Sequence, residues 1–575
     1  MQDNNIVQQS DQEFDVLVVG SGITGGWAAK ECCEAGLKTL LIERGRLVEH
    51  RKDYPTEGKG PWQYPTRTVA DNLLTMQHQA IQQQCYAFND TTKHFFGNDR
   101  DLPYSTEDGT EFSWIRANQL GGKSLLWARQ TFRLSDYDLT ANAKDGHGID
   151  WPIRYKDLAP WYDYVETFAG IAAARDNLPQ LPDSISQPAF ELTKPELDFQ
   201  ATVAEHFPDK PMVVGRCAHL TQPSQIHLEL GRVTCQARSE CYRGCSFGAY
   251  FSTQSATLPA AARTGNLHIA PNSVVHSLIF DESKQRVTGV RVVDNDNLSQ
   301  REYRGKIVFL CASTLGSTQI LLNSTSKTFP NGLANSSGVL GRYLMDHNYN
   351  AWASARIPGY EQEYYRGRRP TGIYIPNFHF EPSRYHKDFV RGYALAGGAT
   401  RGSWQGMSQQ DGFGEAFKQS LTQAGPWQIW MGAQGEMLPR ADNQVSLHPS
   451  KKDKWGIPQL HFNCRWSDNE LTMMQHAAET IKRMMQVAGF EDIQAQATQA
   501  PPGLAIHEVG SARMGQDPKQ SVLNKFNQCH DVPNVFVTDG ASFCSSGVVN
   551  PSLTFMALTA RAAHYAIDQF KAGRL

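Results

Sequence analysis

The sequence predicts a mixed α/β protein, α+β overall, in which an open parallel β-unit is interleaved with a separate antiparallel sheet. Residues 14–45 pass from an apolar run to helical spacing and back to an apolar run, which is the pattern of a βαβ unit. Between Tyr349 and His461, apolar residues alternate in VSLHPS and PQLHFN, as in antiparallel strands. At 575 residues the chain exceeds one ordinary core, so we expect at least two domains.

The amino-terminal unit carries a glycine motif at its first turn. DVLVVG predicts a buried strand, and Gly20, Gly22 and Gly25 form GxGxxG at the start of the helix that follows. In that position the glycines permit a tight turn, the approach of a pyrophosphate and close helix packing. Glu43 ends the second strand, about 20 residues on, where a carboxylate can bind a ribose. This pattern predicts a Rossmann-like dinucleotide site, although NAD would satisfy it too and a glycine-rich turn without ligand is the alternative.

The later segments are assigned from the same periodicities. Residues 50–112 show weak periodicity and predict loops and short helices that cover a ligand. The run from Asn266, LHIAPNSVVHSLIFDESKQRVTGVRVVD, predicts a β-meander. Further on we expect a strand, turn and helix in KIVFLCASTLGSTQILLNS, an amphipathic helix in DNELTMMQHAAETIKRMMQVAG, and a strand, loop and closing helix from NVFVTDGASF onward.

These elements predict two interleaved domains. The expected segments are a first part of the nucleotide-binding domain at 1–150, a substrate or cap segment at 151–214, a second nucleotide-binding part at 215–345, a substrate-binding domain at 346–500 and a carboxy-terminal nucleotide-binding part at 501–575.

Composition argues against several classes of function. The formal net charge is -3 and there is no long basic run, which argues against nucleic-acid binding. No apolar stretch reaches the roughly 20 residues of a membrane span, so we expect no direct membrane insertion. The first residues, MQDNNIVQQSDQEFD, lack the basic start and apolar core of an export signal.

Two carboxy-terminal motifs bring polar residues to predicted turns. His507 precedes a small-residue turn in HEVGSARMG, Asp539 and Gly540 end a strand, and Asn550 stands before Pro551 at the start of a helix. Histidine titrates near neutrality, so His507 suits removal of an alcohol proton, and an amide can bind the same oxygen. Taken singly, such a histidine is more often structural and an Asn before Pro is more often a turn or cap.

A second glycine pair, Gly121 and Gly122, lies in RANQLGGKSLLWAR. This segment is able to wrap a pyrophosphate or a ring edge, but it is ambiguous alone. Together, GSGITGG with Glu43, LGGKS, CASTLGSTQILLNS, HEVGSARMG and DGASFCSSGVVNPSLT resemble the glucose-methanol-choline (GMC) oxidoreductase family of flavoproteins. Within that family, NPSLT and HEVG resemble pyranose oxidase and the flavoprotein subunits of bacterial gluconate, sorbitol and glucose dehydrogenases.

The resemblance implies an enzyme that oxidises a CH-OH group with FAD. Its catalytic pair falls on His507 as the base and Asn550 as the residue that orients the substrate oxygen, with hydride passing to the flavin. The helix that starts near Pro551 would stabilise negative charge on the flavin. Pyranose oxidase attaches its flavin to a histidine where this chain has Leu126, so we expect non-covalent FAD. The expected flavin contacts are Gly20, Gly22, Gly25, Glu43, Arg44, Gly121, Gly122, Ser124, Val275, Ala312, Asp539, Gly540 and Pro551.

Eleven cysteines, an odd number, argue against a disulfide framework. Cys235, Cys241 and Cys245 lie close together in sequence, with Cys217 not far away. Such thiols can bind zinc or an iron–sulfur cluster, or remain a loop with free or disulfide-bonded cysteines. The resemblance to the bacterial sugar dehydrogenases implies a three-iron cluster, [3Fe-4S], although Ser246 replaces the proline of their motif.

The resemblance leaves three functions open. The first is a dehydrogenase acting on a sugar, glycoside or sugar acid, such as a glucoside 3-dehydrogenase, that passes electrons to a small subunit and a cytochrome. The second is an oxygen-using oxidase of the pyranose type, and the third is a flavin-fold protein that binds a partner without turnover. The location is expected to be cytoplasmic, or periplasmic by co-export with a signal-bearing subunit. The sugar, the hydroxyl, the acceptor and the oligomeric state are left open.

Overall fold

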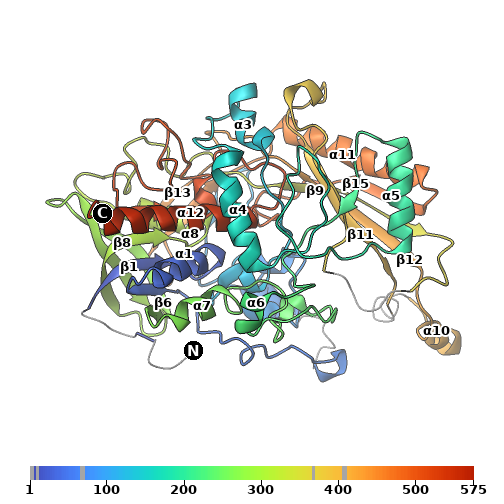
Figure 1. Ribbon diagram of the computed structural model, residues 1–575, viewed down its shortest axis with the longest axis horizontal. Helices are drawn as coiled ribbons and strands as arrows, with labels where there is room; N and C mark the ends of the chain where they lie inside the picture. Colours follow the sequence, from blue (N-terminus) through green and yellow to red (C-terminus); the bar gives the residue numbers. More distant parts are fainter. Residues whose placement is uncertain (1–5, 8–11, 65–71, 365–369, 404–410) are drawn as a thin grey trace.

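The computed structural model describes residues 6–7, 12–64, 72–364, 370–403 and 411–575. Residues 65–71, within the predicted loop region, and residues 365–369 and 404–410, within the predicted antiparallel region, lie outside the described residues. Two sheet systems lie at opposite ends of the long axis of the molecule, and the carboxyl terminus lies at the end that holds the larger sheet (Figure 1).

The larger sheet has seven strands in the order β5-β2-β1-β8-β7-β6, with β16 also paired to β8. Its parallel strands are β1 (Glu13–Val19), β2 (Thr39–Ile42), β5 (Leu267–Ala270), β8 (Gln300–Leu310) and β16 (Val535–Val537). With α1 (Ile23–Glu34), strands β1 and β2 form the predicted βαβ unit. This confirms the Rossmann-like prediction for the amino-terminal part of the chain.

The predicted meander is present, but its first strand was misassigned. Strands β6 (Ser273–Asp281), β7 (Arg286–Asp294) and β8 pair antiparallel. LHIA, by contrast, forms β5 and pairs parallel with β2. The prediction failed there because alternation identifies a strand but not its partner. The long strand β8 pairs with β7 through its first half and with β16 through its second half, so it joins the meander to the parallel strands.

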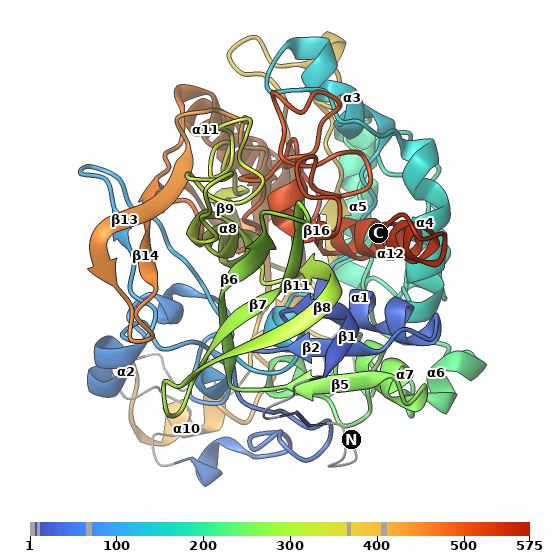
Figure 2. The ribbon, with the colours of Figure 1, turned by 90° about the vertical axis from the view of Figure 1, so that its left-hand side faces the viewer.

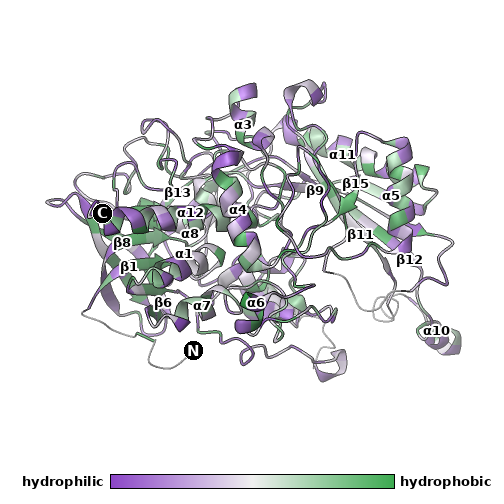
Figure 3. Cartoon of the chain, viewed as in Figure 1, coloured by the Kyte–Doolittle hydropathy of each residue, from purple (hydrophilic) through white to green (hydrophobic). Residues whose placement is uncertain are grey.

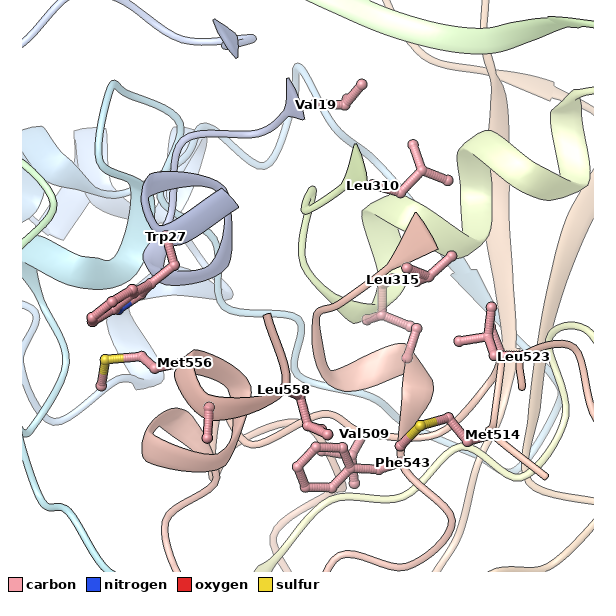
Figure 4. Packing of buried hydrophobic residues seen from close by; sticks show 14 of the residues in the cluster. Val19, Trp27, Leu310, Leu315, Val509, Met514, Leu523, Phe543, Met556 and Leu558 are labelled. Atoms are coloured by element: carbon pink, nitrogen blue, oxygen red, sulfur yellow. The ribbon is translucent and has the colours of Figure 1, made fainter. Parts of the chain in front are cut away.

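Both faces of the parallel strands are buried, which explains the continuous apolar run in DVLVVG. Val16 and Val18 pack with apolar residues of α1, α7 (Thr257–Arg263) and α12 (Ser552–Lys571). Leu17 and Val19 face the opposite cluster, which includes α8 (Thr314–Asn323) (Figure 2). Figure 4 shows this cluster: Val19, Leu310 and Leu315 lie with apolar side chains of the carboxy-terminal segment. The last part of the chain therefore completes the core of the first.

The second sheet has six antiparallel strands in the order β15-β9-β12-β11-β10-β4. Their bounds are β15 (Glu491–Ala497), β9 (Asn348–Ile357), β12 (Trp427–Gly435), β11 (Tyr393–Arg401), β10 (Ile373–Ile375) and β4 (Val213–Val214). The predicted amphipathic helix is α11 (Asp468–Val487), which buries its methionines and alanines against the sheet beside α5 (Lys194–His206). Figure 3 shows mixed colouring along both helices, as expected of helices with one buried face.

A third, small sheet contains β13 (Gln444–Lys452), β14 (Pro458–Asn463) and β3 (Ser105–Thr106). VSLHPS and PQLHFN therefore form the predicted antiparallel pair, but outside the six-stranded sheet. The other helices are α2 (Asn72–His78), α3 (Asp136–Asp145), α4 (Tyr155–Ala169), α6 (Gln225–Glu229) and α10 (Gly414–Ser420). Across the described ranges, none of the helices has the length and apolar character needed to span a bilayer. The domain boundaries near 150, 214, 345 and 500 stay predictions.

Candidate active site

A large cavity lies at the carboxyl ends of the parallel strands. It contains about 1850 Å³ of empty space, including its opening to solvent. Val19 ends β1 and Cys311 follows β8, and both line it. The amino-terminal ends of three helices also line it, through Thr24 of α1, Thr314 of α8 and Ser552 of α12. Because helix amino termini present unpaired N-H groups and positive partial charge, this wall favours an anionic ligand.

The predicted glycine motif supplies one side of this wall. Gly20 has a φ of +94°, and a Cβ there would lie 2.4 Å from the carbonyl oxygen of Cys311. A Cβ on Gly25 would lie 1.8 Å from the carbonyl oxygen of Gly20, so Gly25 serves packing and does not line the cavity. Gly22 lines the cavity, and a Cβ there would meet no atom within 4 Å. The backbone at Gly22 is thus open to a ligand.

The second glycine pair contacts the first motif directly. The Gly121 N-H donates to Ser21 Oγ at 2.8 Å, and a Cβ on Gly122 would lie 3.4 Å from Gly22 Cα. Gly122 and Ser124 line the cavity, whereas Gly121, with a φ of +91°, packs against Gln254. Two segments about 100 positions apart in sequence therefore form one wall.

Glu43 and Arg44 line the cavity; Glu43 is buried and Arg44 is half-buried. Glu43 accepts hydrogen bonds from the N-H groups of Ser21 at 3.1 Å and Gly45 at 2.9 Å. Burial nevertheless raises the pKa of its carboxyl group. The Arg44 guanidinium lies 5.0 Å from the ring centroid of Trp455, and its Nε has no hydrogen-bond partner. An unpaired buried donor of this kind is costly unless a ligand satisfies it.

The other expected flavin contacts also lie at the cavity, namely Val275, Ala312, Asp539, Gly540 and Pro551. Asp539 precedes a 3₁₀ turn that begins at Gly540, and its carboxylate accepts the Ala541 N-H at 3.1 Å. Burial raises the pKa of Asp539 to about 6.

His507 and Asn550 are 43 positions apart in sequence and meet in the cavity wall. Asn550 Nδ2 lies 3.4 Å from His507 Nε2, and both residues line the cavity. Burial, together with the neighbouring His347, lowers the pKa of His507 well below its usual value. The imidazole is therefore neutral near pH 7 and can accept a proton.

Residues outside the predicted set hold His507 in place. The Asp346 carboxylate accepts the His507 N-H at 3.0 Å and the Gly503 N-H at 2.7 Å. Burial, and next the neighbouring Glu508, raise the pKa of Asp346 to about 7. His347 Nδ1 lies 2.9 Å from His507 Nδ1. The only sequence signal for these two residues is an Asp-His pair in LMDHNYN, just before the alternating run that forms β9.

Two cationic side chains of the cavity wall were also not predicted. Lys123 Nζ lies 3.2 Å from the Glu508 carboxylate. Arg129 is buried with its guanidinium 4.5 Å from the ring centroid of Tyr242, and neither Nε nor Nη1 has a hydrogen-bond partner. Both residues lie in or beside the second glycine segment. The buried Arg129 guanidinium adds to the positive potential that the helix termini create, whereas the charge of the half-buried Lys123 is paired with Glu508.

Cys235, Cys241 and Cys245 are free thiols, partly exposed, and they do not line the cavity. Cys241 Sγ lies 3.7 Å from His219 Nε2. Over the part of the chain that the structure describes, no three His, Cys, Asp or Glu side chains are arranged to hold a metal ion. The thiol positions as they stand do not fit a metal site, so the iron–sulfur site stays a prediction without support from the geometry.

Comparisons with known proteins cover almost the whole chain. A family model described as GMC oxidoreductase matches residues 14–349, and a second model of the same description matches residues 439–559.

Curated relatives span similar lengths. The chain is 27% identical to 2-methyl-1,2-propanediol dehydrogenase of Mycolicibacterium austroafricanum, over 98% of this chain and 96% of the relative. It is 25% identical to the fructose dehydrogenase large subunit of Gluconobacter japonicus, over 97% and 98%. It is 24% identical to the gluconate 2-dehydrogenase flavoprotein of Pantoea cypripedii, over 97% and 94%.

A solved structure has the same fold. Pyridoxine 4-oxidase from Mesorbium loti superposes with a TM-score of 0.57 at 15% identity, covering 96% of this chain and 98% of that one. At this identity the likeness concerns the fold alone.

Proposed function

The chain belongs to the GMC oxidoreductase family, and on that premise we propose that it is an FAD-dependent dehydrogenase that oxidises a secondary alcohol of a sugar, glycoside or sugar acid. As a member of this family it is a flavoprotein oxidoreductase that acts on CH-OH groups. The observation that carries the proposal is the meeting of His507 and Asn550 beside the glycine wall of one large cavity.

The cavity fits FAD in size and charge. The backbone at Gly22 and the three helix amino termini would hold the pyrophosphate, because they offer N-H donors without side chains in the way. Glu43 would bind the adenosine ribose, and the unpaired Arg44 Nε would gain a partner at the same end. Leu126 lines the cavity and has no group that can bond covalently to the ring, which supports non-covalent binding. When bound, FAD supplies the acceptor for a hydride.

His507 would act as the base on the substrate hydroxyl. Its neutral imidazole can take the hydroxyl proton at Nε2, the nitrogen that faces Asn550. Asn550 Nδ2 would donate a hydrogen bond to the same oxygen and set its position. General-base catalysis of this kind contributes about 10²–10⁴-fold to a rate.

The names of the relatives and the lining of the cavity both favour a sugar-like substrate. Two of the three dehydrogenases reported above are named for a sugar and a sugar acid. The cavity also offers polar side chains, Gln130 among them, that can bind hydroxyl groups. A polyol therefore suits it better than a long apolar alcohol.

We propose a redox partner, rather than oxygen, as the electron acceptor. The fructose dehydrogenase relative is named as a large subunit, which supports a complex with a small subunit, and we propose a cytochrome as the acceptor of that complex. Such a complex would work in the cytoplasm, or in the periplasm after co-export with its partner. Binding of a [3Fe-4S] cluster by Cys235, Cys241 and Cys245 would require the three thiols to move together. The roles proposed for His507 and Asn550 do not require this cluster. The second candidate, an oxygen-using oxidase of the pyranose type, is supported by two further relatives that are named oxidases, paromamine 6'-oxidase of Streptomyces fradiae and 6'''-hydroxyparomomycin C oxidase of Streptomyces lividus, each 23% identical to this chain.

An anaerobic screen of sugars, glycosides and sugar acids tests the proposal. We expect one class to bleach the flavin, His507→Ala to slow bleaching by about 10²–10⁴-fold, and His227→Ala to have no effect. His227 is a matched control because it is also buried but does not line the cavity.

The same samples separate the alternatives. Peroxide formed in equal amount to product would identify the oxidase, and iron content would decide whether the cluster is present. Failure of every polyol to bleach the bound flavin would refute the proposed activity and favour a partner-binding protein without turnover.

A further inference from the structure

We propose that His347 is a positioning residue that keeps the proton of His507 on Nδ1, so that Nε2 of His507 presents its lone pair to the cavity. This inference rests on the function proposed above. It concerns which of the two nitrogens of the base is available, and the two contacts of His347 with backbone carbonyl oxygens, which can only accept, determine it.

The proton of the neutral His347 ring lies on Nε2. Its Nε2 lies 2.8 Å from the carbonyl oxygen of Gly547 and 3.3 Å from that of Ser546. A carbonyl oxygen only accepts hydrogen bonds, so Nε2 of His347 must carry a hydrogen. The ring is fully buried and its pKa is lowered to about 4, so it is neutral. Its Nδ1 therefore has no hydrogen and can only accept.

The position of the proton on His347 determines the position of the proton on His507. Its Nδ1 lies 2.9 Å from Nδ1 of His347, with the two rings nearly perpendicular at 85°. Since His347 can only accept there, His507 must donate, and its proton lies on Nδ1. The remaining nitrogen, Nε2, then holds a lone pair, which faces the Asn550 amide at 3.4 Å. A hydroxyl group bound at this place would meet the basic nitrogen.

Gln434 and Tyr349 hold the His347 ring in this orientation. Gln434 Nε2 lies 2.9 Å from the same His347 Nδ1, so its N-H and that of His507 share the one lone pair of this nitrogen in a three-centre bond. The Tyr349 hydroxyl holds Gln434 Oε1. Gln434 lies where the pairing of β12 with β9 shifts, between Ala433 and Gly435. Such β-bulges re-aim a side chain, and here the bulge brings a glutamine amide to the histidine.

The consecutive residues Asp346 and His347 thus hold the backbone and the ring of His507, respectively. Asp346 accepts the backbone N-H of His507 at 3.0 Å, and His347 accepts from its ring. Without the imidazole at 347, the proton of His507 is free to move to Nε2, where it would block the lone pair. In the serine-protease triad, the wrong histidine tautomer costs about 10⁴-fold. A smaller loss is expected here because the two tautomers would both be populated.

Kinetics of anaerobic flavin reduction provide the first test. In His347→Ala we expect the limiting reduction rate to fall by about 10- to 1000-fold, with the substrate Kd changed by less than about threefold. In His347→Asn the amide oxygen can replace the accepting nitrogen, so most of the rate should return. His227→Ala is the control for loss of a buried imidazole. An unchanged rate in His347→Ala, or an equal loss in His347→Asn, would overturn the proposal.

The tautomer itself provides a second test that needs no substrate. In ¹⁵N-histidine-labelled holoenzyme, the His507 signal, identified by its loss in His507→Gln, should show the proton on Nδ1 and should shift toward the Nε2-H form in His347→Ala. A wild-type signal with the proton on Nε2 would overturn the proposal, even if His347→Ala failed to fold. If no alcohol reduces the flavin, the proposed function fails, while the tautomer measurement still decides this inference.

Discussion

The two walls of the cavity are built on different principles. The nucleotide wall is built from short contiguous motifs, in which Gly20 and Gly22 act through missing side chains and Gly25 permits the packing behind them. The reaction wall consists of side chains from separate segments, with His507 and Asn550 held by residues at the start of β9 and in β12. A local motif therefore defines the first wall, whereas only the folded chain defines the second.

The reaction wall should control rate without controlling binding. His507→Ala is expected to lower the limiting rate of flavin reduction by about 10²–10⁴-fold, because it removes the base. Asn550→Ala should cause a smaller loss, since it removes one hydrogen bond to the substrate oxygen. The flavin-to-protein ratio should stay at the wild-type value in both variants. A loss of flavin in either one would show that the two walls are not separable.

The nucleotide wall should separate packing from ligand contact within one motif. Gly25→Ala is expected to lower the free energy of unfolding by about 1–3 kcal/mol, because its Cβ would lie 1.8 Å from the Gly20 carbonyl oxygen. Gly22→Ala should leave the flavin-free protein within about 0.5 kcal/mol of wild type, since a Cβ there meets nothing. It should nevertheless weaken FAD binding. Denaturant unfolding and flavin titration measure the two effects, and equal destabilisation by both changes would contradict this division.

Asp346 should make stability depend on pH. Its pKa is about 7 in the folded protein, above the ordinary value of 3.8. A raised carboxyl pKa favours the folded state below about pH 4, and this contribution is lost as pH rises to about 7. Asp346→Asn should remove the dependence, so the Tm advantage of wild type over the variant should be larger at pH 4.5 than at pH 7.5. A Tm difference that does not change with pH would contradict the assignment.

Lys123 should contribute a smaller electrostatic effect. Lys123→Met removes a cation from the cavity wall and leaves the Glu508 carboxylate unpaired. We expect FAD affinity to fall by about tenfold, equivalent to about 1.4 kcal/mol, and the loss to shrink at high salt. Lys519→Met, an exposed lysine outside the cavity, is the control. Salt-independent weakening would indicate a packing role instead.

The contrast between the walls also explains which elements and site residues could be predicted from the sequence. The βαβ unit, α11 and the closing helix follow from periodicity, and Gly20 and Glu43 follow from a motif whose spacing is set by local geometry. The partner of β5 was missed because pairing depends on distant strands. His347 and Gln434 were missed for the same reason, since neither belongs to a motif with His507, and only the fold brings them within 2.9 Å of one another.

The last strand and helix have a consequence for how the protein is made. Strand β16 pairs with β8 of the large sheet and α12 packs on α1, although both are synthesised long after α1. Contacts between such distant parts of a chain form slowly and only after both parts exist. The nucleotide wall therefore cannot close while β16 and α12 are unmade. We expect the wall to bind FAD only after these two segments have been synthesised and have packed against the amino-terminal unit.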